Sequence, residues 1–152
     1  MNKLYIQKQA LGINDMILIR KTNDFSKIRD IRIETFKHLK LSNNDIFDKD
    51  DQVLDQFLII HDGKTVGSFR LREISSFYKI ERMGIVPFYR SNGFGRLALN
   101  EIKILSKNKG KSKIILDSIY GVRNFYAKSG FVQTGEVYFK VGIPHVNMYL
   151  EL

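Results

Sequence analysis

The sequence contains no cysteine, few acidic residues relative to basic ones, and no long uninterrupted hydrophobic run. The absence of cysteine excludes disulfides, a thiolate nucleophile and a zinc–thiolate site. No window approaches the roughly 18 apolar residues of a membrane-spanning helix. Residues 1–15 mix lysines and glutamines with single hydrophobic residues, unlike the apolar core of a signal peptide. We therefore expect a cytoplasmic protein without a membrane segment.

The shortage of acidic residues gives the chain a strongly basic character. There are 25 Lys and Arg against 16 Asp and Glu, for a net charge of +9. Such a charge raises the encounter rate with polyanions, which include nucleic acids and phosphate-bearing cofactors. The basic run Lys107–Lys111 is the best evidence for nucleic-acid binding, but no aromatic residue is interleaved to stack on bases. We therefore favour a solvated helix end and disfavour a nucleic-acid partner.

The length of 152 residues, with 43% hydrophobic and 27% charged residues, predicts a single soluble domain over residues 1–152. Within it, residues 1–15 are expected to form an arm or a short extra strand. Apolar runs bounded by turn signals predict the remaining strands. These are residues 16–20, 57–61, 65–72, 77–86, 113–117, 131–140 and 146–150.

Two helices are expected on the basis of periodic hydrophobic residues. Asn23 or Asp24 can cap the first helix, whose predicted buried stripe is Ile28, Ile31, Phe36 and Leu39. The second helix begins after Gly93. A further short helix is expected over residues 121–129, and residues 142–145 are expected to form a turn.

The connections give the expected topology. Asp62-Gly63 is a strong two-residue hairpin signal, and Ser75-Ser76 makes a second turn, so three antiparallel strands follow the first helix. Because a helix connects the strand ending at Val86 to the strand starting at Lys113, these two should be parallel. The expected fold is a mixed, mostly antiparallel sheet of about six to seven strands with helices on both faces.

The segment from Ile85 to Gly95 reads as strand, loop and helix, and its composition is typical of a phosphate-binding corner. Pro87 ends the strand, and Gly93 and Gly95 allow the backbone to approach a ligand at a helix N-terminus. Two glycines alone are weak evidence. However, Val86-Pro87 followed by Arg90-Ser91-Asn92-Gly93-Phe94-Gly95 resembles the Arg/Gln-x-x-Gly-x-Gly/Ala signature of the GNAT superfamily of N-acetyltransferases.

Two further segments strengthen this resemblance. Asn124–Phe131 is similar to the Phe-Tyr-x-Lys-x-Gly-Phe stretch of GNAT proteins, and Gly142–Leu150 resembles the Gly-Ile-Pro-His-Val-x-Met end of one bacterial branch. Ile31–Phe36 matches that branch more loosely. The three main matches occur in the same order as in the family. They imply a GNAT fold and an acetyl-CoA-dependent N-acetyltransferase that requires no metal.

The resemblance also implies which residues contact the coenzyme. Backbone N–H groups of Ser91, Asn92, Gly93, Phe94, Gly95 and Arg96 would bind the pyrophosphate, with Arg90 and Arg96 adding positive charge. Ile85 and Val86 would pair with the pantetheine arm, and an N–H group near Ile85 would polarise the thioester carbonyl. Asn124 is a further coenzyme contact of the family stretch.

Catalysis needs a proton donor for the leaving thiolate and a base for the amine. Tyr126 matches the family tyrosine that protonates the thiolate, although Phe125 and Tyr126 could instead be core aromatics. Glu81 is the candidate base, since strand alternation puts it on the same face as Ile85. A structural partnership of Glu81 with Arg70 or Arg82 is an equal alternative, and His145 and His38 are weaker candidates.

The acceptor is a small-molecule or peptide amine whose identity the sequence leaves open. The acidic loop Asp45–Asp51 could attract a cationic acceptor. Ile119 replaces a side-chain amide that is common in the family, and the Glu-Gln-Gly pattern after the first helix is replaced. The C-terminal strands of such folds often meet a second subunit, so the resemblance allows a homodimer but leaves the oligomeric state open. A non-catalytic acyl-CoA-binding regulator and a basic nucleic-acid-binding module remain as alternatives.

Overall fold

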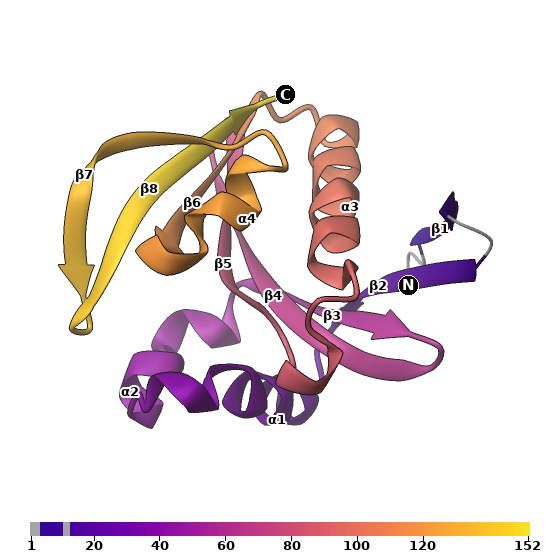
Figure 1. Ribbon diagram of the computed structural model, residues 1–152, viewed down its shortest axis with the longest axis horizontal. Coiled ribbons are helices and arrows are strands. Elements are labelled where there is room, and N and C mark those ends of the chain that lie inside the picture. Colours follow the sequence, from indigo (N-terminus) through magenta and orange to yellow (C-terminus); the bar gives the residue numbers. More distant parts are fainter. Residues whose placement is uncertain (1–3, 11–12) are drawn as a thin grey trace. The chain divides into compact units, whose positions relative to one another are not determined.

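The structure is a computed structural model that describes residues 4–10 and 13–152 (Figure 1). Residues 1–3 and 11–12, part of the expected arm, lie outside the described residues. The chain divides into two compact units, Met1–Arg70 with Arg82–Ala98, and Leu71–Glu81 with Leu99–Leu152. Strands β4 (Lys64–Ile74) and β5 (Phe77–Ile85) and helix α3 (Phe94–Asn108) each contribute residues to both units.

The first two strands form an antiparallel pair at one end of the sheet. Strand β1 (Leu4–Ala10) pairs with β2 (Ile13–Thr22), with Leu4 opposite Ile19 and Ala10 opposite Ile13. Of the two expectations for residues 1–15, the extra strand is therefore confirmed for Leu4–Ala10. The strand predicted over residues 16–20 lies within β2, which extends beyond it at both ends.

Helix α1 (Phe25–Phe36) begins as the sequence predicts, because the Asp24 side chain accepts a hydrogen bond from the Lys27 N–H at 3.4 Å. Its buried residues are Ile28, Arg32 and Thr35. Of the predicted stripe, Ile28 is fully buried, whereas Ile31, Phe36 and Leu39 are half-buried. The helix buries an arginine because its guanidinium has a buried carboxylate to pair with, as described below.

Short helical turns connect α1 to the next strand. The 3₁₀ turn η1 (Lys37–Leu39) is followed by α2 (Asn43–Ile46) and η2 (Lys49–Gln52). Asp45 and Asp51 each close a capping box at the start of one of these turns. The sequence predicted a loop here with one helical turn, so the structure adds a second turn.

Strand β3 (Asp55–His61) and strand β4 are joined by the predicted hairpin turn. Asp62 and Gly63 both have left-handed backbone, with φ of 49° and 73°, as a tight two-residue hairpin requires. A second turn with Ser75 at φ 49° leads into β5. The strand order is β1-β2-β3-β4-β5-β6-β8-β7. The mixed, mostly antiparallel sheet is confirmed, with β1 as the strand beyond the seven predicted.

The second unit contains the parallel pair of the sheet. Strand β6 (Lys113–Ile119) runs parallel to β5, with residues 77–80 opposite residues 113–116, as the helical connection predicts. Turn η4 (Tyr120–Val122) and helix α4 (Arg123–Ala127) follow. Strand β8 (Ile143–Glu151) then pairs with β6 on one side and with β7 (Val132–Lys140) on the other.

The β7–β8 connection is tighter than the sequence predicts. The turn consists of Val141 and Gly142, with φ of 49° and 74°, and β8 starts at Ile143. The turn expected over residues 142–145 is therefore wrong. Pro144 can lie within β8 because it is the second residue of the strand, beyond the last pair with β6 (Ile119 opposite His145), and faces only β7.

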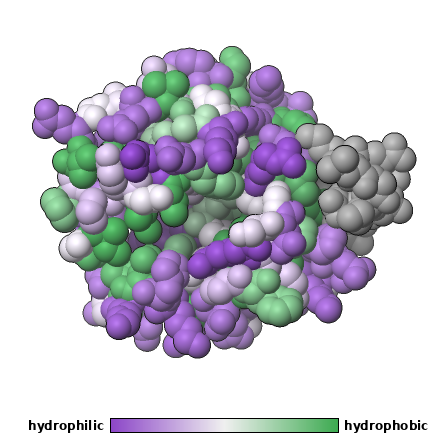
Figure 2. Space-filling model, viewed as in Figure 1, coloured by the Kyte–Doolittle hydropathy of each residue, from purple (hydrophilic) through white to green (hydrophobic). Residues whose placement is uncertain are grey.

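Each unit has buried apolar side chains, and in the first unit Ile28 of α1 packs with Leu58 and Ile60 of β3. On the face seen in Figure 2, hydrophilic residues gather in purple patches with green hydrophobic residues between them. None of the helices in the described part of the chain is long and apolar enough to cross a membrane.

Candidate functional site

The turn between β5 and α3 contains the glycine-bearing signature. After the 3₁₀ turn η3 (Pro87–Tyr89), Ser91 and Gly93 both adopt left-handed backbone, with φ of 63° and 80°. Left-handed glycine is expected, whereas left-handed serine is uncommon. Alternating backbone conformations of this kind direct successive N–H groups toward one side of a turn.

Two side chains of this turn have partners within the protein. The Asn92 Nδ2 atom donates to the carbonyls of Tyr89 at 3.1 Å and Arg90 at 3.0 Å. Phe94 is buried, with its ring 4.6 Å from the His61 ring between centroids. Of the residues predicted to bind the coenzyme, Asn92 and Phe94 are therefore available through their backbone and not through their side chains.

Helix α3 provides free N–H groups directly after the turn. Its first hydrogen bond back to the turn runs from the Leu97 N–H to the Gly93 carbonyl at 3.0 Å. The N–H groups of Phe94, Gly95 and Arg96 precede it and have no acceptor within the helix. A Cβ atom at Gly93 would lie 3.8 Å from Arg96 Nη2, so a guanidinium borders these donors. This donor set fits an anion such as a diphosphate.

Arg90 is directed elsewhere. Its Nε donates to the Ile85 carbonyl at 3.0 Å, and its Nη2 donates to the Thr35 carbonyl at 2.8 Å. The side chain thus fastens the turn to the end of β5 and to α1. The predicted pyrophosphate contact of this guanidinium would have to use its remaining N–H groups.

The end of β5 has one edge occupied. The Val86 N–H donates to the Val66 carbonyl of β4 at 2.8 Å, so it is not available to a ligand. Successive backbone groups of a strand point to opposite edges, so the Ile85 N–H is directed away from β4. The register of β5 with β6 covers residues 77–80 and stops before Ile85. Of the two residues predicted to contact the pantetheine arm, Ile85 and Val86, only Ile85 therefore directs its N–H toward the open edge of the strand.

Strand β5 bends at Arg82, whose φ is 53°. Left-handed backbone within a strand is typical of a β-bulge, which interrupts the two-residue repeat. Burial alternates from Phe77 to Ile80 and not beyond. The prediction that Glu81 shares a face with Ile85 assumed an unbroken repeat, so it loses its basis.

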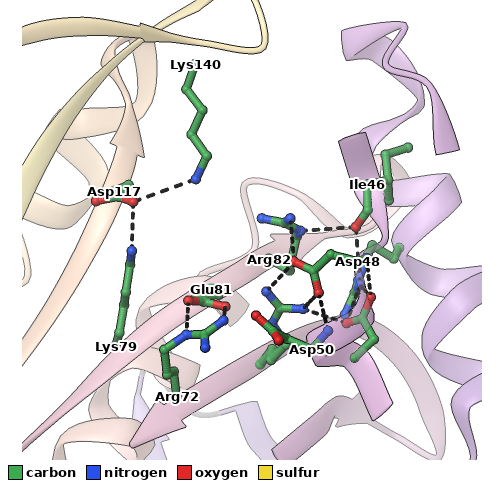
Figure 3. Close-up of polar contacts among 12 residues, drawn as sticks. Ile46, Asp48, Asp50, Arg72, Lys79, Glu81, Arg82, Asp117 and Lys140 are labelled. Atoms are coloured by element: carbon green, nitrogen blue, oxygen red, sulfur yellow. Dashed lines mark hydrogen bonds and ion pairs between the residues drawn. The ribbon is translucent and has the colours of Figure 1, made fainter. Parts of the chain in front are cut away.

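Glu81 has a structural partner. Its carboxylate accepts from Arg72 Nε at 2.7 Å and from Arg72 Nη2 at 3.3 Å, and its side chain is 9% exposed (Figure 3). Of the alternative partners named from the sequence, Arg82 is wrong, because it pairs with Asp48, whereas a partnership with Arg70 stays a prediction. Glu81 could act as a base only after leaving Arg72 or through water.

Tyr126 lies in α4, where its ring contacts Phe125 and Phe131 at centroid distances of 4.9 and 5.9 Å. Burial raises the pKa of Tyr126 to about 12. The hydroxyl is therefore protonated at neutral pH, but it is a weaker acid than the free phenol assumed in the sequence argument. Asn124, on the same short helix, is exposed and accepts the Lys128 N–H at its carbonyl.

The acidic loop is not a free negative surface. Asp51 is buried and accepts from Arg32 Nη1 at 2.8 Å and Arg70 Nη1 at 2.8 Å. Asp48 accepts from Arg70 at 2.8 Å and from Arg82 Nη2 at 3.3 Å. The charges of these two carboxylates are thus compensated by arginines, and the expectation that the acidic loop attracts a cationic acceptor stays a prediction. A hydrophobic repeat in the sequence cannot reveal this network, because a repeat counts only apolar residues and treats a buried arginine as a surface residue.

The remaining candidates are weaker. His145 Nδ1 lies 2.7 Å from the Ile143 carbonyl, which occupies one ring nitrogen, and His38 is exposed. Across the side chains that the structure describes, no group of three or more His, Asp or Glu residues could hold a metal ion.

Comparison with known proteins agrees with the geometry of the turn. A family model described as an acetyltransferase (GNAT) domain matches residues 25–152. The chain belongs to the GNAT acetyltransferase family. The match includes the glycine-bearing turn, α3 and the segment that carries Tyr126.

Individual proteins and solved structures are also similar to this chain. An uncharacterized Bacillus subtilis protein, YyaT, is 30% identical over 115 residues, which cover 74% of this chain and 78% of the relative. Escherichia coli ElaA has a similar fold, with a TM-score of 0.76, 19% identity, and coverage of 90% of this chain and 100% of ElaA. A GNAT family acetyltransferase from Elizabethkingia anophelis, solved with acetyl-CoA bound, gives a TM-score of 0.71, 17% identity, and coverage of 90% and 98%.

Proposed function

We propose that this GNAT protein is an N-acetyltransferase that transfers the acetyl group of acetyl-CoA directly to a primary amine. The observation that carries the proposal is the turn from Ser91 to Arg96, where left-handed backbone, a helix N-terminus and a guanidinium converge. The Elizabethkingia anophelis relative solved with acetyl-CoA supports the choice of donor.

Each step of the reaction has a candidate group on this chain. The N–H groups of Gly93, Gly95 and Arg96 would bind the diphosphate, and the bound coenzyme would supply an activated thioester. The Ile85 N–H, a rigid backbone donor, would stabilise negative charge on the thioester oxygen. The Tyr126 hydroxyl would donate a proton to the leaving sulfur, and Glu81 would accept a proton from the amine through water or after leaving Arg72.

The donor part of the proposal is tested by ligand-dependent melting with two matched variants. Arg96→Ala and Lys107→Ala each remove one positive charge from an exposed position of α3, at opposite ends of the helix. Acetyl-CoA at about 100 times its Kd should stabilise the wild type by about 2.7 kcal/mol. Loss of the charged contact in Arg96→Ala should weaken binding about 10-fold, whereas Lys107→Ala should bind like the wild type.

The transfer part is tested by incubating the protein and acetyl-CoA with a library of primary amines and measuring thiol release. Release that depends on one amine supports the proposal. Binding of acetyl-CoA without release for any amine favours the non-catalytic acyl-CoA-binding alternative. If acetyl-CoA does not stabilise the wild type, the proposed function is wrong. Salt-dependent binding to nucleic acid is then the next hypothesis to test.

A further inference from the structure

Strand β5 bends at a residue that carries a long side chain. Arg82 has φ 53°, a conformation that costs free energy for any residue with a Cβ atom. Glycine adopts this conformation without cost, but the glycine of the strand, Gly84, does not have a positive φ. Such a conformation persists only where surrounding contacts determine it. The side chain of Arg82 is therefore expected to supply those contacts.

The guanidinium of Arg82 makes two contacts with one segment. Its Nε donates to the Ile46 carbonyl at 3.0 Å, and its Nη2 donates to the Asp48 carboxylate at 3.3 Å (Figure 3). Both acceptors belong to residues 43–52, which comprise α2 and the following 3₁₀ turn and are called the 43–52 segment below.

The two acceptors are held in place by other arginines. The Ile46 carbonyl also accepts from Arg32 Nη1 at 3.3 Å, and Asp48 also accepts from Arg70 Nη1 at 2.8 Å. Hydrogen bonding and charge from Arg70, together with the charge of Arg82, hold the pKa of Asp48 at about 2, so its carboxylate is ionised at neutral pH. Arg82 thus contacts a fixed and charged support.

The backbone beyond the bend is closely confined. A Cβ atom at Gly84 would lie 2.1 Å from Thr35 Cγ2 of α1, so the strand and the helix are in direct contact there. The next residue, Ile85, carries the N–H proposed to contact the thioester, and the Val86 N–H pairs with Val66 at 2.8 Å. A change in the direction of β5 at Arg82 would disturb these contacts.

We propose that Arg82 is a positioning residue for acetyl transfer. Its guanidinium holds the 43–52 segment against the left-handed bend of β5. The same contacts therefore determine both the order of this segment and the direction of the Ile85 N–H. The catalytic consequence rests on the proposed function. The coupling between the segment and the strand end does not require a ligand.

The coupling is tested by amide hydrogen exchange in the free protein. The Phe47 N–H, bonded to the Asn43 carbonyl at 2.8 Å, reports on the segment, and the Val86 N–H reports on the strand end. Asp48→Asn, a change within the segment, should speed exchange at both amides about 10-fold. The control is Lys21→Ala, which removes an exposed ion pair of the first unit and should change neither rate by more than about twofold.

Variants of Arg82 separate the side-chain contacts from the backbone conformation. Arg82→Ala loses the contacts and keeps the strain, so both amides should exchange faster. Arg82→Gly also loses the contacts, but glycine adopts φ 53° freely. Phe47 should therefore exchange as in Arg82→Ala, while Val86 should exchange about threefold more slowly than in Arg82→Ala. Equal Val86 rates in the two variants would overturn the proposal, as would an unchanged Val86 rate in Asp48→Asn.

If Arg82→Ala does not fold, Arg82→Lys takes its place, because a single ammonium can satisfy only one of the two acceptors at a time. It should give rates between those of the wild type and of Asp48→Asn. Wild-type rates at both amides would overturn the proposal.

The catalytic consequence is tested by calorimetric binding of CoA and acetyl-CoA. Only acetyl-CoA carries the carbonyl that the Ile85 N–H would contact, so the wild type should bind it more tightly than CoA. Arg82→Ala should reduce this preference about threefold and leave the Kd of CoA within about twofold, because the Ser91–Arg96 turn has its own anchors. Equal weakening of both ligands, or no preference in the wild type, would contradict a positioning role. If the wild type binds neither ligand, the proposed function fails while the exchange result is still interpretable.

Discussion

Replacement of Asp51 by asparagine should strongly destabilise the protein. The Asp51 carboxylate accepts from Arg32, Arg70 and Gln56, all buried, and from the backbone N–H of Asp48. The side chains of Arg32 and Arg70 are 1% and 2% exposed. An amide keeps the shape of the carboxylate but directs two N–H donors at these cations and removes the charge that compensates them.

The size of the effect follows from the burial. Breaking a buried ion pair by removing one partner costs about 3–5 kcal/mol, because the remaining charge is left buried without compensation. For a chain of this length that loss corresponds to a Tm decrease of about 6–20 °C. It is a large part of a total stability of about 5–15 kcal/mol.

Urea unfolding of the wild type and Asp51→Asn at pH 7, followed by circular dichroism, measures the difference. The control is Asp55→Asn, which removes the exposed Lys21–Asp55 pair at 2.9 Å and should cost about 0–1 kcal/mol. A loss below about 1 kcal/mol in Asp51→Asn would refute the reasoning, since it would mean that the buried guanidiniums tolerate a neutral partner.

The same variant tests the pH dependence. Burial alone would raise the pKa of Asp51, but the hydrogen bond from Asp48 N–H and the pairing with Arg32 and Arg70 outweigh it and lower the pKa. A carboxyl with a lowered folded pKa stabilises the protein above its unfolded pKa of about 3.9, and this contribution disappears as the pH falls through the folded value. Wild-type stability should therefore fall more steeply than that of Asp51→Asn below about pH 4.

Three further predictions follow from other parts of the structure. Tyr126→Phe should lower kcat about 100-fold and leave the Kd of CoA unchanged, as comparison of transfer rates with calorimetry would show; equal rates would remove Tyr126 as the acid. Because the pKa of Tyr126 is raised to about 12, the wild type should lose stability as the pH rises above about 10, and Tyr126→Phe should lose less, measured by alkaline urea unfolding. Gly84→Ala should cost about 1–3 kcal/mol in urea unfolding, because its Cβ would lie 2.1 Å from Thr35; a smaller loss would show that α1 yields easily.

Much of the fold could be predicted from local patterns. Turn residues such as Asp62-Gly63 favour one backbone conformation, that of a tight hairpin. A helix between two neighbouring strands favours their parallel pairing. The turn that contains Gly93 and Gly95 could likewise be predicted from its local sequence. The single domain, the cytoplasmic location and the homodimer stay predictions.

What the sequence could not reveal depends on contacts between distant residues. Arg32 appears polar in any periodic pattern, yet it is buried because Asp51 lies 19 positions away and reaches it. The left-handed backbone of Arg82 has no local signal, so strand alternation was extended through it to Glu81. For the same reason the acidic loop was interpreted as a surface charge, whereas Asp48 and Asp51 face arginines of the interior.

The Val141–Gly142 turn offers a site for engineering. Valine at φ 49° is a conformational outlier, since β-branched residues rarely adopt this region, whereas asparagine tolerates it. An Asn-Gly turn is the preferred hairpin sequence, so Val141→Asn should make the hairpin easier to close without a change in its contacts. Val141→Asn should therefore raise the Tm of the protein without changing any residue of the Ser91–Arg96 turn.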